Sequence, residues 1–155
     1  VPVIAKEVGN GISVDAATRL QRAGVKALDV AGYGGASWSA VEAQRAVKQG
    51  KRPDTAFAAW GIPTEEALVS VRQALPDIQL IASGGVRSGV DIAKAIALGA
   101  DLGAFGQPLL AAALESSAKV IEFIAGVIHE LKVSMLCVGA VDLTALRKAP
   151  LVRQS

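Results

Sequence analysis

The sequence is poor in the residues that mark several common protein classes. Its 155 residues include one cysteine, Cys137, one histidine, His129, and 4% aromatic side chains. A single cysteine excludes an internal disulfide framework, and its apolar neighbours predict a reduced, buried thiol in a reducing cytoplasm. A lone histidine on a helical segment, without a cysteine or histidine partner nearby, predicts a solvated side chain and not a metal ligand.

Long runs of one kind of residue are also absent. No stretch reaches the roughly 18 apolar residues of a membrane helix, because Asp, Lys, Gly or Pro interrupts each one. The net charge is only +2 and the longest basic run is Lys51-Arg52, so neither a membrane nor a nucleic acid is expected as a partner. The chain starts at Val1 inside an apolar run that does not resemble a signal peptide, and we therefore expect it to be part of a longer protein.

Apolar runs alternate with helical patterns along the chain, which is 52% hydrophobic and long enough for one domain. We expect strands at residues 1–8, 25–31, 78–82 and 101–105, and the first of them should be buried on both faces. Helices are expected at residues 14–23, 39–47, 64–75 and 89–98, and nearly continuously after residue 108. Residues 49–61 should form a long loop. Four strand-helix units predict a parallel sheet covered by helices. Two architectures fit: a small open doubly wound sheet, or half of a (β/α)8 barrel, which needs about 250 residues when complete.

The segment Ile81–Gly89 is the strongest candidate for a binding site. It delivers two glycines, whose missing side chains let backbone N–H groups approach an anion, and Arg87 adds a charge-assisted donor. Ser88 and Asp91 have the spacing of a capping box at the start of a helix, whose N-terminus favours negative charge. The pattern predicts a phosphate cradle, although a plain glycine turn would look the same. Gly103–Gly106 strengthens the prediction, because barrel phosphate sites are typically built by the loops after the last two strands.

Lys6 ends an otherwise apolar run, where a charged amine is costly unless it meets an anion or a polarised ring. A pair with Glu7, or a side chain reaching solvent, explains it equally well. The glycine-rich segment Gly32–Ser37 follows the next strand and so belongs at the same end of the sheet. We expect the loops after these strands to surround one ligand.

Several segments, in this order, resemble the type 2 isopentenyl diphosphate isomerase family. They are Val3–Gly9, Asp29–Trp38, Trp60–Thr64 and Ala82–Arg87, and the tail Leu146–Val152 is similar to the C-terminus of that family. The resemblance covers essentially the whole chain. It implies that residues 1–155 form the C-terminal half of a (β/α)8 barrel, strands five to eight, followed by an extended C-terminal helical tail.

The resemblance also implies an activity and its cofactors. The family interconverts isopentenyl and dimethylallyl diphosphate with reduced FMN, Mg2+ and NADPH as the flavin reductant, in a cytoplasmic homo-oligomer. The reaction has no net redox change, and the reduced flavin mediates proton addition and removal at the allylic carbons. The diphosphate and Mg2+ ligands of the family lie in the preceding half, so we assign no catalytic or metal-binding residue here and expect this piece alone to be inactive.

By position, the resemblance places cofactor-binding residues at the ends of all four strands. Lys6 would contact the flavin ring, the loop at Ala36 would border the cofactor, and its phosphate would be held by Gly85, Val86, Arg87, Phe105 and Gly106. Two of these positions depart from the family pattern. Ala36 replaces an expected threonine and removes a hydroxyl, and Phe105 replaces a small residue, so that the second phosphate contact rests on the backbone.

Two alternatives remain open at this stage. Another FMN barrel, such as a 2-hydroxy-acid oxidase, shares the strand-Gly-Gly-x-Arg-helix pattern, but those enzymes need a histidine and an arginine near the flavin. His129, the only histidine, lies in the late helical tail. The second alternative is a half barrel without catalytic activity that binds a phosphate-bearing ligand or a partner protein.

Overall fold

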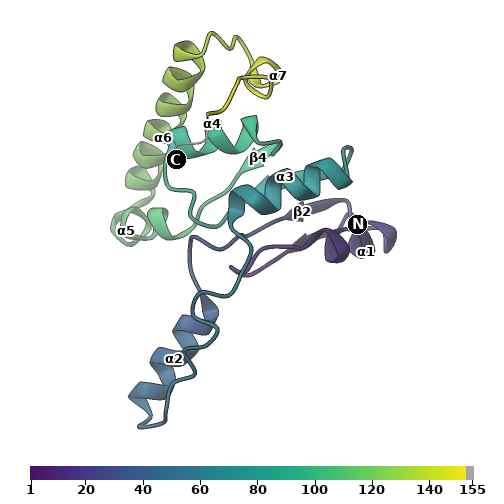
Figure 1. Cartoon of the computed structure of the whole chain (residues 1–155). Helices are drawn as coiled ribbons and strands as arrows, with labels where there is room; N and C mark the ends of the chain where they lie inside the picture. Colours follow the sequence, from purple (N-terminus) through teal and green to yellow (C-terminus); the bar gives the residue numbers. More distant parts are fainter. Residues whose placement is uncertain (153–155) are drawn as a thin grey trace.

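Four short parallel strands form the centre of the structure, a computed structural model that describes residues 1–152 (Figure 1). They are β1 (Ile4–Lys6), β2 (Ala27–Asp29), β3 (Gln79–Ala82) and β4 (Leu102–Gly103), hydrogen-bonded in that order. Each pair is parallel, with Lys6 opposite Asp29 and Asp29 opposite Ile81. Successive parallel neighbours with helices between them are the repeating unit of a β/α barrel.

Helices follow the strands as the sequence predicts. They are α1 (Val14–Arg22), α2 (Trp38–Lys48), α3 (Thr64–Ala74), α4 (Gly89–Ala97), α5 (Gln107–Glu115), α6 (Ser117–Cys137) and α7 (Leu143–Leu146). Ser13 caps α1 by accepting a hydrogen bond from the Ala16 amide, and the Ser88–Asp91 capping box of α4 is present. These caps satisfy backbone N–H groups that lack a partner within the helix, which explains why the helices begin where they do.

The two faces of the sheet differ in their side chains. Leu28 of β2 and Leu80 of β3 are fully buried and pack with Leu68 of α3 in the main core cluster. Because side chains alternate along a strand, the neighbouring row, Lys6 and Asp29, lies on the opposite face. The helices thus pack against one face of the sheet, and the charged side chains of Lys6 and Asp29 lie on the opposite face.

Both edges of the sheet are open among the described residues. Ile4 of β1 is 58% exposed and Leu102 of β4 is 59% exposed, and neither strand has a second neighbour within residues 1–152. The expectation that residues 1–8 form a strand buried on both faces is therefore wrong. The apolar run is present, but β1 lies at an edge where no further strand of this segment covers it.

An ion-pair cluster connects the N-terminal ends of β3 and β4 to the C-terminal tail. Arg72 of α3 donates to the carbonyl oxygens of Gly99, Pro76 and Ile78 at 2.6–2.9 Å and to Asp101 at 2.7 Å. Arg147, just after α7, donates to the other oxygen of Asp101 at 2.7 Å. The cluster joins α3, β3, β4 and the end of α7 through a single carboxylate.

Helix α6 packs mainly against α4 and α5. Val127 is buried, but Ile121 is 68% exposed and Cys137 is also exposed. The expectation that Cys137 lies in the core is wrong, because Cys137 ends α6 and lines an open groove with Val90 and Leu151. His129 is exposed as expected. No helix within residues 1–152 has both the length and the apolarity needed to cross a membrane.

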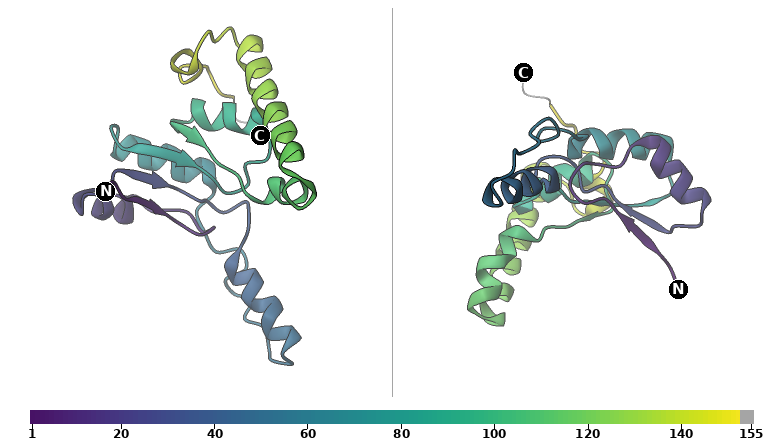
Figure 2. Two further views of the ribbon diagram at one scale, coloured as in Figure 1. Left: turned by 180° about the vertical axis from the view of Figure 1, so that it is seen from behind. Right: turned by 90° about the horizontal axis from the view of Figure 1, so that it is seen from below.

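Helix α2 projects away from the sheet and from the other helices, as Figure 1 and the left view of Figure 2 show. None of its residues is buried. The irregular segment that returns from it contains no helix or strand until Thr64, as predicted for residues 49–61, and carries an edge-to-face pair between Phe57 and Trp60.

Candidate functional site

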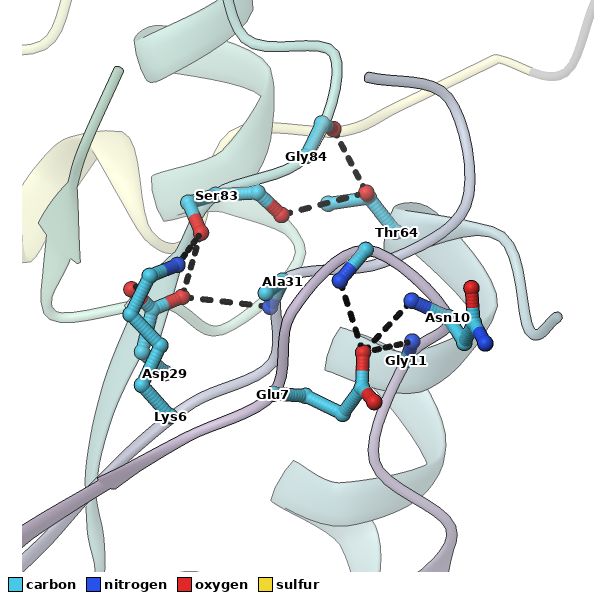
Figure 3. Close-up of polar contacts among 10 residues, drawn as sticks. Lys6, Glu7, Asn10, Gly11, Asp29, Ala31, Thr64, Ser83 and Gly84 are labelled. Carbon is cyan, nitrogen blue, oxygen red and sulfur yellow. Dashed lines mark hydrogen bonds and ion pairs between the residues drawn. The ribbon is translucent and has the colours of Figure 1, made fainter. Parts of the chain in front are cut away.

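Three polar side chains meet at the C-terminal ends of adjacent strands (Figure 3). Lys6 ends β1, Asp29 ends β2, and Ser83 follows β3 directly. In a parallel sheet the carboxyl ends of all strands share one edge, which is where α/β folds place their ligands. The expectation that the loops after these strands lie together is confirmed for β1, β2 and β3.

The contacts among these side chains are short and specific. The Lys6 Nζ lies 3.0 Å from Asp29 Oδ2 and donates to Ser83 Oγ at 3.0 Å. Ser83 Oγ donates to Asp29 Oδ1 at 2.5 Å, and the Ala31 amide donates to the same oxygen at 3.1 Å. Asp29 is 5% exposed, so its charge is balanced by hydrogen bonds and by the ammonium group and not by water.

Glu7 has a different role from the one that its position next to Lys6 suggests. Its Oε2 accepts hydrogen bonds from the amides of Gly9, Asn10 and Gly11 at 2.5–3.1 Å and so organises the loop after β1 (Figure 3). Lys6 pairs with Asp29 instead. Of the two alternatives for Lys6, the pair with Glu7 is therefore wrong, while the side chain remains 56% exposed on the site side.

The turn after β3 has a conformation that only glycine adopts easily. Gly84 and Gly85 have φ angles of +94° and +79°, in the left-handed region. The Thr64 hydroxyl, at the start of α3, donates to the carbonyl oxygens of Ser83 and Gly84 at 3.2 and 2.6 Å. Thr64 thus fixes the turn from the side of α3, while backbone from the loop after β2 approaches it closely at Gly32 and Gly35.

The amides of this turn are available to a ligand. The N–H groups of Gly84, Gly85 and Val86 donate no hydrogen bond within residues 1–152, and neither do those of Phe105 and Gly106. The turns after β3 and β4 leave the same edge of the sheet, because Ala82 and Gly103 are paired. Free amides at one edge, beside the start of a helix, are what an anion-binding site requires.

Arg87 stands exposed beside this turn. Its guanidinium makes a long contact of 3.4 Å with the Gly34 carbonyl oxygen and forms no ion pair within the described part of the chain. Its amide and that of Ser88 are held by the Asp91 carboxylate at 3.0 and 3.1 Å. The backbone of Arg87 is thus fixed at the capped start of α4, while its guanidinium remains free to pair with an anion.

The remaining predicted site residues lie at the same edge of the sheet but are more exposed to solvent. Ala36 is exposed, and its carbonyl oxygen abuts the backbone of Gly9. Phe105 is half-buried and packs edge to face on Phe123 of α6, with ring centroids 5.8 Å apart, while Gly106 is exposed before α5. Phe105 therefore faces α6, and its role toward a ligand, like those of Ala36 and Gly106, stays a prediction.

Three residues of the site were not predicted from the sequence. Asp29, Ser83 and Thr64 complete the contacts around Lys6 and the glycine turn. Each lies in a segment that resembles the isomerase family, but none was assigned a role there. A signal was nevertheless present: Lys6 and Asp29 carry opposite charges at the ends of two successive apolar runs. In a parallel sheet such ends are neighbours, and the pairing follows from the topology.

Parallel β/α units with glycine-rich turns at the carboxyl edge place the chain among the α/β proteins, either doubly wound sheets or β/α barrels. The comparison with solved structures distinguishes the two. Mandelate oxidase superposes with a TM-score of 0.71 over 97% of this chain and 38% of its own, at 24% identity. A Pediococcus acidilactici protein described as a lactate oxidase has a TM-score of 0.73 and 25% identity, over 100% of this chain and 37% of its own. The fold is thus part of a (β/α)8 barrel.

The family follows from the sequence comparison. The profile of the FMN-dependent dehydrogenase family matches residues 1–153, and the chain belongs to that family. Isopentenyl-diphosphate delta-isomerases are similar to it: that of Stutzerimonas stutzeri is 51% identical over 100% of this chain and 45% of its own length. That of Cronobacter sakazakii is 50% identical over 99% and 44%. The chain thus spans less than half the length of these relatives.

Proposed function

We propose that these residues are the FMN-phosphate-binding half of a flavin-dependent isopentenyl-diphosphate delta-isomerase. The observation that carries the proposal is the glycine turn after β3. Within residues 1–152 the amides of Gly84–Val86 donate no hydrogen bond and Arg87 beside them forms no ion pair. Relatives named as this isomerase are similar at 51% identity over the full chain. In the proposed assignment, residues 1–155 supply strands five to eight of the barrel.

The residues at the carboxyl edge fit FMN in their chemistry. A phosphate dianion needs amide donors and a cation, and the turn after β3 offers both. A flavin ring carries electron-rich oxygen and nitrogen atoms, which suit the ammonium group of Lys6. A Cβ on Gly85 would lie 2.8 Å from the Gly34 carbonyl oxygen, so glycine at this position lets the loops after β2 and β3 approach each other. Donors and charge thus match the cofactor.

Each part of the site has a distinct task in this proposal. Arg87 and the amides of Gly85, Val86, Phe105 and Gly106 bind the phosphate, and the loop at Ala36 borders the cofactor. Lys6 orients the ring at its pyrimidine side. The reduced flavin, when bound, supplies the proton chemistry at the allylic carbons of the substrate. The chain's own residues bind and orient, and none of them is assigned as an acid or base.

The open edges of the sheet support a barrel completed by further chain. Strands with unpaired N–H and C=O groups and exposed apolar side chains are normally covered. A groove of about 910 Å3 runs beside β1, lined by residues that include Lys6, Ile12, Leu20 and Trp60. We propose that the preceding half of the protein covers these edges and supplies the residues that bind the diphosphate and Mg2+. We further propose that the enzyme is a cytoplasmic homo-oligomer and that NADPH reduces its flavin. The 155-residue piece alone is then inactive.

The decisive experiment uses the full polypeptide that contains this chain. We expect it to bind FMN and, under anaerobic reducing conditions with Mg2+, to convert isopentenyl diphosphate into dimethylallyl diphosphate, followed by NMR of the product. Failure to bind FMN together with no isomer formed would reject the proposal. Oxidation of a 2-hydroxy acid with release of the keto acid would instead identify an oxidase.

Replacing Arg87 by alanine tests the phosphate site directly. Loss of a charge-assisted hydrogen bond to an anion costs about 1.5–3 kcal/mol, so the FMN dissociation constant should rise about 10- to 100-fold. Because the side chain is exposed, the free energy of unfolding should change by less than about 0.5 kcal/mol. Arg19→Ala on the surface of α1 is the matched control. An unchanged flavin dissociation constant, measured by fluorescence titration, would remove Arg87 from the site.

A further inference from the structure

Asp29 is the most deeply buried charged side chain at the site, and its two oxygens have separate tasks. Oδ1 accepts from the Ser83 hydroxyl and the Ala31 amide, at 2.5 and 3.1 Å. Oδ2 faces the Lys6 ammonium at 3.0 Å. The backbone of Ala31 has an unusual φ of +36°, and its amide is bound to the same carboxylate. The carboxylate is therefore locked in one orientation before any ligand arrives.

Lys6 is held at two of its three possible donor positions. One N–H points to Asp29 Oδ2 and one to Ser83 Oγ, each at 3.0 Å. An ammonium group has three donors and no acceptor, so one N–H remains for a ligand. The stem is otherwise free to move, because the side chain is 56% exposed. Without its two partners, the flexible lysine side chain would lose conformational entropy when it bound a ligand.

We propose that Asp29, with Ser83, is the positioning residue that holds the Lys6 ammonium in place for the flavin ring. This inference rests on the proposed flavin function for its ligand, but the Asp29–Lys6 contact itself is independent of it. Asp29 would act through Lys6 without touching the cofactor. The fixed carboxylate orients the ammonium and leaves one of its donors free for the ligand.

The substitution Asp29→Asn separates this role from a structural one. Asparagine has the same shape and keeps an oxygen that can accept from Ser83 and Ala31. In place of Oδ2 it carries an NH2 group, which is a donor facing another donor. The variant therefore breaks the contact with Lys6 and retains the contacts that shape the loop. Ser83→Ala removes the second partner of Lys6 and leaves the carboxylate, so it serves if Asp29→Asn does not fold.

The first measurement needs no flavin. In the full polypeptide without cofactor, acetylation of the Lys6 amine by a limiting reagent is followed by peptide mass spectrometry, with exposed Lys26 as an internal reference. An amine released from an ion pair reacts faster, so the ratio of Lys6 to Lys26 labelling should rise at least about threefold in Asp29→Asn. An unchanged ratio would show that Asp29 does not hold Lys6 and would overturn the inference.

The second measurement is a double-mutant cycle on the FMN dissociation constant, with Lys6→Met as the other arm. Asp29→Asn should raise the dissociation constant about tenfold or more when Lys6 is present, and less than about twofold in the Lys6→Met background. The same increase in both backgrounds would mean that Asp29 acts on the fold and would overturn the inference. Faster labelling in a protein that binds no FMN would reject the proposed function while leaving the Asp29–Lys6 contact established.

Discussion

Replacing Gly84 by alanine is expected to lower the free energy of unfolding by at least about 3 kcal/mol, with loss of FMN binding. Gly84 has a φ of +94°, and an added Cβ would lie 2.1 Å from the Gly32 carbonyl oxygen and 2.6 Å from the Gly32 amide nitrogen. Both neighbours are backbone atoms of the adjacent loop, so neither can rotate away. Urea unfolding followed by circular dichroism gives the measurement.

Gly24, after α1, provides a matched control for this substitution. It has the same φ of +94°, but an added Cβ would have no atom within 4 Å. Gly24→Ala should therefore cost only the backbone strain, about 1–2 kcal/mol. The difference between the two variants isolates the steric contact. Equal losses at both positions would contradict the close approach of the loops after β2 and β3.

Replacing Arg72 by methionine is expected to cost about 3–5 kcal/mol of stability. The side chain is 20% exposed and donates to three carbonyl oxygens as well as to Asp101. Methionine fills part of the same volume but leaves those acceptors without a donor. Arg19→Met is the control, because its pair with Asp15 is exposed and should contribute less than about 1 kcal/mol. Similar midpoints of urea unfolding for the two variants would contradict a structural role for Arg72.

The same cluster makes stability depend on acidity. Burial alone would raise the pKa of Asp101, but the Leu80 amide and the Arg72 and Arg147 guanidinium groups outweigh it and hold the pKa below the ordinary value of an aspartate. A carboxyl group with a lowered folded pKa stabilises the protein above the unfolded pKa and loses that contribution as pH falls through the folded value. Stability should thus decline below about pH 4, and less steeply in Arg72→Met. Parallel acid profiles would contradict this origin.

The order of strands and helices could be predicted from the sequence because local signals agree with the fold. The Ser88–Asp91 capping box marks the start of α4, and the break before Pro76 marks the end of α3. Exposure could not be predicted in the same way. Ile4 and Cys137 lie in apolar runs that indicate burial, but burial depends on which element packs against them. Ile4 lies on an edge strand and Cys137 in an open groove, so both side chains remain exposed.

The part of the candidate site that lies in one continuous segment could be predicted from the sequence. The part that depends on contacts between residues of different strands could not. Arg87 and the two glycines before it lie in one continuous segment, so their chemistry is visible in sequence. The contact between Lys6 and Asp29 joins positions 23 residues apart, and that of Lys6 with Ser83 joins positions 77 apart. Those contacts depend on strand register, which a single sequence specifies only weakly.

Helix α2 depends little on the rest of the molecule, because none of its side chains is buried. A segment with so few contacts can unfold locally at small cost while the sheet stays intact. Its Arg45 and Lys48 are exposed, and basic residues follow it at Lys51 and Arg52. Trypsin would thus reach this arm before the barrel strands, and length changes there would be tolerated better than anywhere between β3 and β4.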